Sequence, residues 1–371
     1  MSKPVCIVTG IVHPLAAYTS LHNLLSIIES EGKKTEFFQS GVLLDFSSFK
    51  NVTNHWIPYT SPDIKIFRVF TFLYFQMRLS VQLIHYHHHF DSVILIFGSE
   101  NFSIPLLVLK ILRKRVILYY VSSQPKIYSF IHPELVFLFS CIQRVHNAVS
   151  DKIIVYSPNL INEWDFGKYR NKIVIAHEYF FKETFTVTLP FSDRPPRVGY
   201  IGRLSAEKGV QNLVRALPHI LGIRKDLRVL IGGEGDLMES IQLSLAEEDF
   251  TDQVDLPGWI SQDDLPQYLN QLQLLILPSY TEGLPTIMLQ ALACGTPVLA
   301  TAVGAIPDII RDGETGFIMR NNSPECIAEN VIRVMSSQIR ETVGQQGRRF
   351  VEEHFTFEKT RESLRPVINT L

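Results

Sequence analysis

The fold signal in this 371-residue chain is strongest in residues 276–310, which read ILPSYTEGLPTIMLQALACGTPVLATAVGAIPDII. The apolar run at the start ends at Pro278, which indicates a buried strand followed by a loop. Pro285 stands where the first turn of a helix tolerates a missing N–H, and Gly295 is expected to end that helix. A new strand begins at Pro297. The stretch therefore predicts a strand–loop–helix–strand unit.

The start of the predicted helix combines a carboxylate with backbone donors. Free N–H groups at a helix start attract phosphate, whereas the carboxylate of Glu282 in the same loop would oppose it. Glu282 is therefore expected to face hydroxyl groups attached to that phosphate. A phosphate together with hydroxyl groups indicates a sugar nucleotide as the ligand.

The composition is that of a globular protein with about two or three domains. Hydrophobic residues make up 46% of the chain and charged residues 19%, enough to bury substantial cores. The net charge of −2 hides an asymmetry. Residues 1–190 carry 18 basic and 13 acidic residues, net +5, and the remainder carries 17 basic and 24 acidic residues, net −7. Such asymmetry favours different partners for the two halves.

The four cysteines show no C-x-x-C spacing, and two of them lie inside apolar elements, which predicts reduced core thiols. They are Cys6, Cys141, Cys294 and Cys326. No run approaches the about 18 apolar residues of a membrane-spanning helix. The apolar run before Gly10 is too short for a signal peptide. A cytoplasmic protein, soluble or peripheral to a membrane, is expected.

Residues 1–190 alternate between strand and helix patterns, which predicts a parallel sheet with helices on both faces. A buried strand over 5–9 is closed by Gly10, for which a structural turn and a ligand contact are both open; His13 nearby is a further candidate. Ligands gather at the carboxyl ends of parallel strands. The side chains and turns expected there are Gly10, Ser99, Glu100, Asn101, Ser122 and Ser123.

Residues 64–89 predict a long helix that is rich in aromatic residues and interrupted by Arg68 and Arg78. One interpretation is a core helix under the sheet. The other is an apolar, basic surface that touches a bilayer or a lipid-linked acceptor. The histidines at its end, His85 and 87–89, point in different directions and lack Asp or Cys ligands beside them, which favours a solvated helix end over a metal site.

The proline-rich segment 190–196, PFSDRPP, is the expected linker, and the strand–helix alternation restarts after it. The chain is therefore predicted to be an α/β protein of two Rossmann-like, doubly wound domains with a ligand cleft between them. The loop 202–209, GRLSAEKG, places Arg203 and Lys208 at the same sheet edge as Glu282. Arg203 would grip a diphosphate bidentately, and Lys208 would add a point charge.

Five segments resemble, in order, the donor domain of the family-four retaining glycosyltransferases, which have the GT-B fold. They are GYIGRLSAEKG, IGGEGDL, LPGW, PSYTEGLPTIMLQALACGTPVLAT and GAIPDIIRDGETGF, and they span nearly all of residues 197–320. The resemblance implies an acceptor-side domain over 1–190 and a nucleotide-sugar donor domain over 191–355. A C-terminal helix over 356–371 is expected to cross back to the first domain.

The resemblance assigns Arg203 and Lys208 to the donor diphosphate and Glu282 to the transferred sugar. It assigns the backbone of 283–286 to the phosphate and Gln290 to the ribose. The positions that it implies in donor binding besides the first three are Gly10, Gly202, Gly283, Leu284, Pro285, Thr286 and Gln290. The family mechanism needs neither a metal nor a cofactor beyond a nucleoside diphosphate sugar such as a UDP or GDP sugar.

Three positions depart from the family pattern. Gln290 replaces the second glutamate of the E-x7-E motif and keeps one acceptor oxygen while losing the charge. The histidine common in the first domain has no counterpart, and His177-Glu178 replaces the usual Asn-Gly before the interdomain segment. The departures bear on the ribose contact and on the acceptor side.

The sequence thus predicts a retaining, metal-independent hexosyltransferase that moves a sugar from a nucleoside diphosphate to a hydroxyl acceptor. That acceptor is lipid-linked, a glycan or a small molecule, and a lipid-linked one would place the protein at the inner face of the membrane. No nucleic-acid partner is expected. The alternative is a catalytically weak or inactive GT-B scaffold that binds a sugar nucleotide or a partner. An epimerase or phosphorylase would need an acid/base set or a pyridoxal-binding lysine, and neither is evident.

Overall fold

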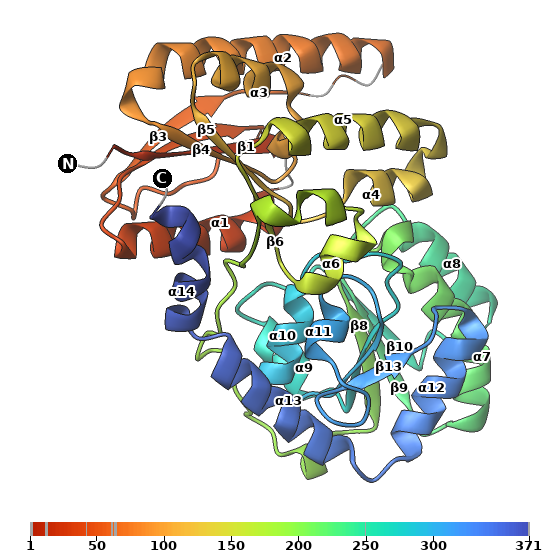
Figure 1. The fold of residues 1–371 in the computed structure, drawn as a ribbon. Coiled ribbons are helices and arrows are strands. Elements are labelled where there is room, and N and C mark those ends of the chain that lie inside the picture. The colour runs from red at the N-terminus through yellow and green to blue at the C-terminus, as the bar shows by residue number, and fades with distance from the viewer. Residues whose placement is uncertain are drawn as a thin grey trace. The chain divides into compact units, whose positions relative to one another are not determined.

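The computed structural model describes residues 3–11, 14–41, 43–60, 62, 65–248 and 250–369; His13 lies outside them. The chain divides into two compact units, each built around one parallel sheet (Figure 1). The first unit comprises Met1–Pro125, Glu134–Phe180 and Phe357–Leu371. The second comprises Lys126–Pro133 and Phe181–Thr356.

The sheet of the first unit has seven parallel strands in the order β3-β2-β1-β4-β5-β6-β7. They are β1 (Val5–Ile11), β2 (Thr35–Ser40), β3 (Val52–Ile57), β4 (Ser92–Ile96), β5 (Arg115–Tyr119), β6 (Lys152–Val155) and β7 (Ile173–Ile175). β4 is buried along its whole length, as expected for a strand covered on both faces. β1 continues through Gly10, so the prediction that Gly10 closes this strand was wrong.

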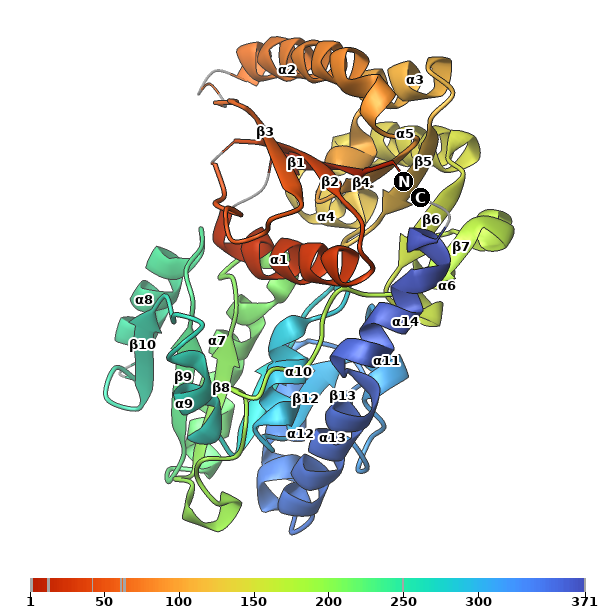
Figure 2. The ribbon, with the colours of Figure 1, turned by 90° about the vertical axis from the view of Figure 1, so that its left-hand side faces the viewer.

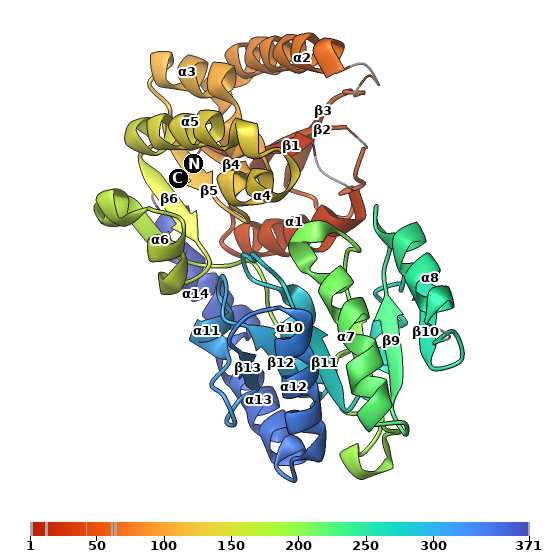
Figure 3. The ribbon, with the colours of Figure 1, turned by 90° about the vertical axis from the view of Figure 1, so that its right-hand side faces the viewer.

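Helices cover both faces of this sheet, with α1 on one side and α2 and α3 on the other (Figures 2 and 3). The helices of this part of the chain are α1 (Pro14–Ser30), α2 (Lys65–Tyr86), α3 (Ser103–Ile111), α4 (Gln124–Ile131), α5 (Val136–Val149), α6 (Pro158–Glu163) and α14 (Phe357–Ile368). Short 3-10 turns lie at His87–His89, Ser99–Asn101, Pro133–Leu135 and Gly167–Lys172. No helix within the described ranges is long and apolar enough to cross a membrane.

The C-terminal helix α14 belongs to the first unit. Thr360 Oγ1 donates to the carbonyl oxygen of Tyr179 at 2.8 Å, and Arg365 lies 3.3 Å from the carboxylate of Glu31 on α1. The helix is therefore fixed to residues far from it in the chain.

The first unit ends at Phe180, and residues 190–196 pack within the second unit instead of forming a free linker. Asn270 binds the preceding segment, since its Oδ1 accepts from Thr188 N at 2.8 Å and its Nδ2 donates to Thr186 O at 2.9 Å. The buried guanidinium of Arg194 donates to Cys294 O at 2.7 Å and to Thr296 Oγ1 at 2.7 Å. These contacts fix a segment whose composition alone suggested a linker.

The sheet of the second unit has six parallel strands in the order β10-β9-β8-β11-β12-β13. They are β8 (Arg197–Ile201), β9 (Arg228–Gly232), β10 (Val254–Gly258), β11 (Leu274–Leu277), β12 (Val298–Thr301) and β13 (Phe317–Met319). The helices are α7 (Val210–Ile223), α8 (Met238–Glu247), α9 (Leu265–Asn270), α10 (Thr286–Ala293), α11 (Ile306–Ile309), α12 (Pro324–Ser336) and α13 (Arg340–His354). Two 3-10 turns lie at Phe191–Asp193 and Ala206–Lys208.

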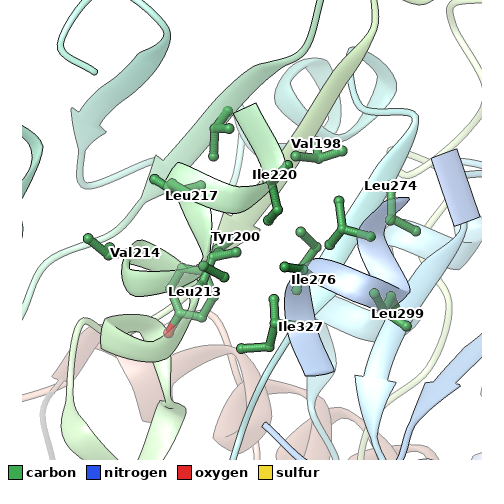
Figure 4. Packing of buried hydrophobic residues seen from close by; sticks show 14 of the residues in the cluster. Val198, Tyr200, Leu213, Val214, Leu217, Ile220, Leu274, Ile276, Leu299 and Ile327 are labelled. Atoms are coloured by element: carbon green, nitrogen blue, oxygen red, sulfur yellow. The ribbon is translucent and has the colours of Figure 1, made fainter. Parts of the chain in front are cut away.

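A single apolar core joins this sheet to α7 and α12. Figure 4 shows Val198 and Ile276 of neighbouring strands facing Leu217 and Ile220 of α7, with Ile327 of α12 closing the cluster. All five side chains are fully buried. The β8 and β11 strands that carry the candidate site loops are thus held side by side by a packed core.

Candidate donor site

The strand–loop–helix–strand unit predicted from residues 276–310 is present as β11, α10 and β12. Gly295 ends α10 with φ +67°, as predicted from its position. Because β11 pairs in parallel with β8, the loops that follow these two strands lie at the same edge of the sheet. The loop after β8 carries Arg203 and Lys208, and the loop after β11 carries Glu282.

Glu282 is held in a buried position by both loops. Its carboxylate is 8% exposed, and Oε2 lies 2.7 Å from Lys208 Nζ. The hydroxyl of Ser279, also buried, donates to Oε1 at 2.7 Å. The expected convergence of Lys208 and Glu282 is therefore observed, and Ser279 is a partner that the sequence did not single out.

Arg203 differs from Lys208 in being largely free to move. Its side chain is 64% exposed, and its one ion-pair contact in the described chain is a 3.6 Å approach of Nη1 to Glu207 Oε1. Glu207 is buried and accepts from Ser205 Oγ at 2.7 Å. The guanidinium therefore keeps most of its five N–H donors available to a ligand.

The start of α10 offers backbone donors. Pro285 caps the helix with φ −71°, and the first turn is tight because Met288 N donates to Pro285 O at 3.0 Å. The N–H groups of Gly283, Leu284 and Thr286 meet no acceptor among the residues that the structure describes. Three donors at one helix start are suited to bind phosphate oxygens.

Gly304 supports this loop from the other side, a role that the sequence did not reveal. It has φ +62°, and a Cβ there would lie 2.4 Å from the carbonyl oxygen of Glu282. Ala305 N donates to Gly283 O at 2.8 Å, and Thr301 Oγ1 donates to Ser279 O at 2.5 Å. The segment after β12 therefore fixes the backbone on which Glu282 and the free amides stand.

Gly233 allows the loop after β9 to approach the backbone of Gly202 closely. A Cβ at Gly233 would lie 1.9 Å from Gly202 O, and one at Gly202 would lie 3.1 Å from the hydroxyl of Tyr200. That hydroxyl donates to Arg203 O at 2.6 Å. Burial, and then the charges of Glu282 and Glu207, raise the pKa of Tyr200 well above its usual value, so the phenol stays protonated and keeps its donor role.

Comparison with known proteins gives these features a context. Residues 181–350 match the family model described as glycosyl transferases group 1. This chain is similar to the group 1 glycosyltransferases over that region. It is 26% identical over 224 residues to an uncharacterized glycosyltransferase of Methanocaldococcus jannaschii, 60% of each chain. It is 28% identical over 230 residues to a capsular polysaccharide biosynthesis glycosyltransferase of Staphylococcus aureus, 60% of this chain and 57% of the relative.

The solved structures similar to this chain cover both of its units. Anabaena HepE in complex with UDP and glucose aligns over 100% of both chains with a TM-score of 0.77 and 13% identity. Sucrose-phosphate synthase from Thermosynechococcus elongatus aligns over 99% of both chains with a TM-score of 0.77 and 18% identity. These likenesses establish the GT-B fold. Three of the curated relatives, the Staphylococcus aureus protein and two of Methanocaldococcus jannaschii, are matched over between 53% and 60% of their own lengths.

Gln290, which departs from the family motif, lies buried on α10. Its Nε2 donates to Gln262 Oε1 at 3.1 Å. Gln262 is a further residue that sequence reasoning missed, because it lies 28 residues away with no local pattern joining the two. This hydrogen bond satisfies one N–H of the Gln290 side-chain amide and leaves the side-chain oxygen Oε1 as an acceptor.

The candidates of the first unit are turned inward. Gly10 N donates to Phe97 O at 3.1 Å, and a Cβ at Gly10 would lie 2.3 Å from that same oxygen, so close backbone packing explains this glycine. Ser99 is buried and donates to Val8 O at 2.6 Å. Glu100 is fully buried, its Oε2 accepts from Gly98 N at 2.6 Å, and burial raises its pKa to about 8.

A buried carboxyl at Glu178 joins three strands of the first unit. The hydroxyl of Tyr119 donates to its Oε2 and that of Tyr156 to its Oε1, the latter at 2.9 Å. Burial raises the pKa of Glu178. Its neighbour His177 donates from Nδ1 to Tyr179 O at 2.9 Å, and burial lowers its pKa to about 4. The His-Glu departure from the family motif therefore lies within an internal network.

One histidine after α2 binds a carboxylate, since His89 Nδ1 lies 3.1 Å from Glu36 Oε1. The same carboxylate is bound by His55 of β3, whose Nε2 lies 2.6 Å from Glu36 Oε2. Among the residues that the structure describes, no three His, Cys, Asp or Glu side chains are arranged to hold a metal. The four cysteines are free thiols, three of them buried, and burial raises the pKa of Cys294 to about 12.

Proposed function

We propose that this chain is a group 1 glycosyltransferase that transfers a sugar from a nucleoside diphosphate sugar to a hydroxyl acceptor with retention of anomeric configuration. The observation that carries the proposal is the ion pair of Lys208 with Glu282, 2.7 Å long, beside the free amides of α10 and the exposed guanidinium of Arg203. Lys208 neutralises Glu282, so a phosphate can approach a carboxylate that would otherwise repel it.

Each group has a role in the proposed reaction. Arg203, Lys208 and the amides of 283–286 stabilise the negative charge that develops on the departing diphosphate. Glu282 accepts hydrogen bonds from sugar hydroxyls and orients the ring. The acceptor hydroxyl attacks the anomeric carbon from the face that the diphosphate leaves, and its proton passes to a phosphate oxygen of the leaving group. Side-chain cations and amides supply the charge stabilisation, so we propose a metal-independent reaction.

The donor is proposed to be a UDP or GDP hexose. The Anabaena protein was solved with UDP and with UDP-glucose, and a Corynebacterium glutamicum relative, 29% identical over 190 residues, is described as GDP-mannose-dependent. That relative is described as acting on a phosphatidylinositol monomannoside. We propose a lipid-linked, glycan or small-molecule hydroxyl as acceptor, and peripheral contact of the first unit with the inner face of the cytoplasmic membrane.

The test is donor turnover by the purified chain against a panel of nucleoside diphosphate sugars, with and without EDTA. Wild type should turn over one donor class in both conditions, and proton NMR of the product should show the donor's anomeric configuration. Arg203→Ala and Glu282→Ala should lose about 100-fold or more in kcat/KM. Arg311→Ala, at an exposed arginine that pairs with Glu314, is the matched control and should keep wild-type rates. Inversion, or an inactive EDTA sample restored by metal, would contradict the proposed mechanism.

The hydrogen bond between the buried Gln290 and the exposed Gln262 supports a second candidate, a sugar-nucleotide-binding scaffold without turnover. In that case the donor would stabilise the protein against heat while no acceptor pool, lipid extracts included, gave a product. Turnover restored by Gln290→Glu would identify position 290 as the cause.

A further inference from the structure

Helix α2 is apolar on two opposite faces, and only one of them is covered. Phe75, Leu79 and Leu83 are buried against the first unit, and the ring of Phe75 lies 5.6 Å from that of Phe102. The opposite face carries a stripe of exposed apolar side chains at helical spacings of three and four residues. These are Phe67, Phe70, Leu73, Tyr74, Met77, Val81 and Ile84.

The stripe is long and strongly exposed. Phe70 is 62% exposed and Val81, three turns further on, is 63% exposed. A helix of 22 residues is about 33 Å long, so the apolar stripe extends along most of that length. Single exposed apolar residues are common on protein surfaces, but a continuous stripe marks an interaction site.

The charges around the stripe are of one sign. Residues 65–86 include Lys65, Arg68 and Arg78 and no aspartate or glutamate. Arg68 and Arg78 are exposed, and Arg68 Nε donates to Pro62 O at 2.8 Å. Helix α3 lies beside α2 in Figures 1 and 3, and the chain after it carries the exposed Arg113 and the buried Lys114, which donates to Phe90 O at 2.7 Å. Arg78 is four residues after Tyr74 and three before Val81, so it borders the stripe. An exposed apolar stripe bordered by a cation, on a helix without acidic side chains, is the pattern of a helix lying in an anionic membrane interface.

We infer that the exposed face of α2 docks onto an anionic lipid surface, with its apolar stripe inserted at the headgroup boundary and Arg78 against lipid phosphates. A second copy of the chain is the competing occupant. Pairing of two α2 stripes would bring like charges together, and the helix offers no carboxylate to neutralise them. Charge complementarity therefore favours lipid. This deepens the membrane contact proposed above, but its test requires no sugar donor and can fail independently of the activity.

The experiment is flotation of the full chain with vesicles of phosphatidylcholine alone or mixed with phosphatidylglycerol, at low and high salt. Wild type should float with the anionic vesicles and be released by salt. Phe70→Glu/Met77→Glu should abolish flotation, and Arg78→Gln should weaken binding by about fivefold. Leu243→Glu, at an exposed apolar position on α8, is the matched control and should float as wild type does.

Circular dichroism of each variant separates a lost contact from a lost fold. The inference is overturned if wild type stays with the soluble fraction at low salt, or if folded Phe70→Glu/Met77→Glu floats as wild type does. It is equally overturned if sedimentation shows a dimer that this double substitution dissociates while no vesicle binds wild type, because the occupant is then a second copy.

Discussion

Replacing Gly304 with alanine should weaken donor binding while the second unit stays folded. A Cβ at this position would lie 2.4 Å from Glu282 O and 2.8 Å from Gly283 O. Real Cβ contacts are not shorter than 3.0 Å, so the carbonyl group of Glu282 would have to move by about 0.6 Å. The displaced segment carries both the sugar-binding carboxylate and the amides of α10.

The magnitude follows from two separate costs. The left-handed backbone at φ +62° costs an alanine about 1–2 kcal/mol of stability wherever it occurs. Misplacing reacting groups by about 1 Å can cost about 100-fold in rate. A shift of about 0.6 Å in the loop therefore predicts a loss of about tenfold or more in kcat/KM and a weaker donor affinity.

The variant Gly313→Ala separates the cost of the left-handed backbone from the cost of displacing the loop. Gly313 has φ +76°, but the nearest atom to its Cβ would be Ile339 Cδ1 at 3.9 Å, so this variant carries the backbone strain without the clash. Denaturant unfolding should show both variants destabilised, and calorimetric titration of the donor should show weaker affinity for Gly304→Ala alone. Equal donor affinities in the two variants would refute the reasoning.

Further expectations concern the buried polar groups. The pKa of Glu100 is raised to about 8 from its ordinary 4.5. The free energy of unfolding should therefore fall as the pH rises between these values, by up to about 5 kcal/mol. Glu100→Gln should flatten this pH dependence in thermal unfolding. Gln290→Glu should tighten the donor affinity measured by calorimetry, because the carboxylate offers a second acceptor oxygen. The same substitution should lower the free energy of chemical unfolding by about 1–3 kcal/mol, because Gln262 only partly satisfies a buried carboxylate. Tyr156→Phe removes a hydrogen-bond donor from Glu178 and should lower the free energy of unfolding by about 1–3 kcal/mol in the same assay. An unchanged denaturation midpoint would show that this hydrogen bond adds nothing to stability.

Local patterns allowed the donor side to be predicted well. The turn residues Pro285 and Gly295 lie at the ends of α10, and the loop glycines bracket Arg203 and Lys208. The residues that form each of these signals lie within a few positions of one another in the sequence. The placing of Lys208 beside Glu282, which are 74 residues apart, followed from the rule that parallel strands bring their following loops to one edge.

The first unit was harder to predict because its decisive contacts are not local. Glu178 meets Tyr119 and Tyr156 across sequence separations of 59 and 22 residues, with no spacing that marks them. Helix α2 posed a different difficulty. Its aromatic residues occupy both faces, so periodicity does not tell which face packs; Phe75 is buried and Phe70 exposed. The core-helix interpretation describes the covered face, and the membrane interpretation of the exposed face stays a prediction.

The negative charge of the second half, net −7 over residues 191–371, does not oppose its proposed affinity for a diphosphate. Within the site the charges are paired: Lys208 with Glu282 at 2.7 Å, and Arg203 with Glu207 at 3.6 Å. Attraction must then come from short-range donors, namely the mobile guanidinium and the free amides of α10, because exposed charges more than about 10 Å away are screened by salt. Glu282, which looked like an obstacle to phosphate in the sequence, is the group that holds Lys208 at this edge.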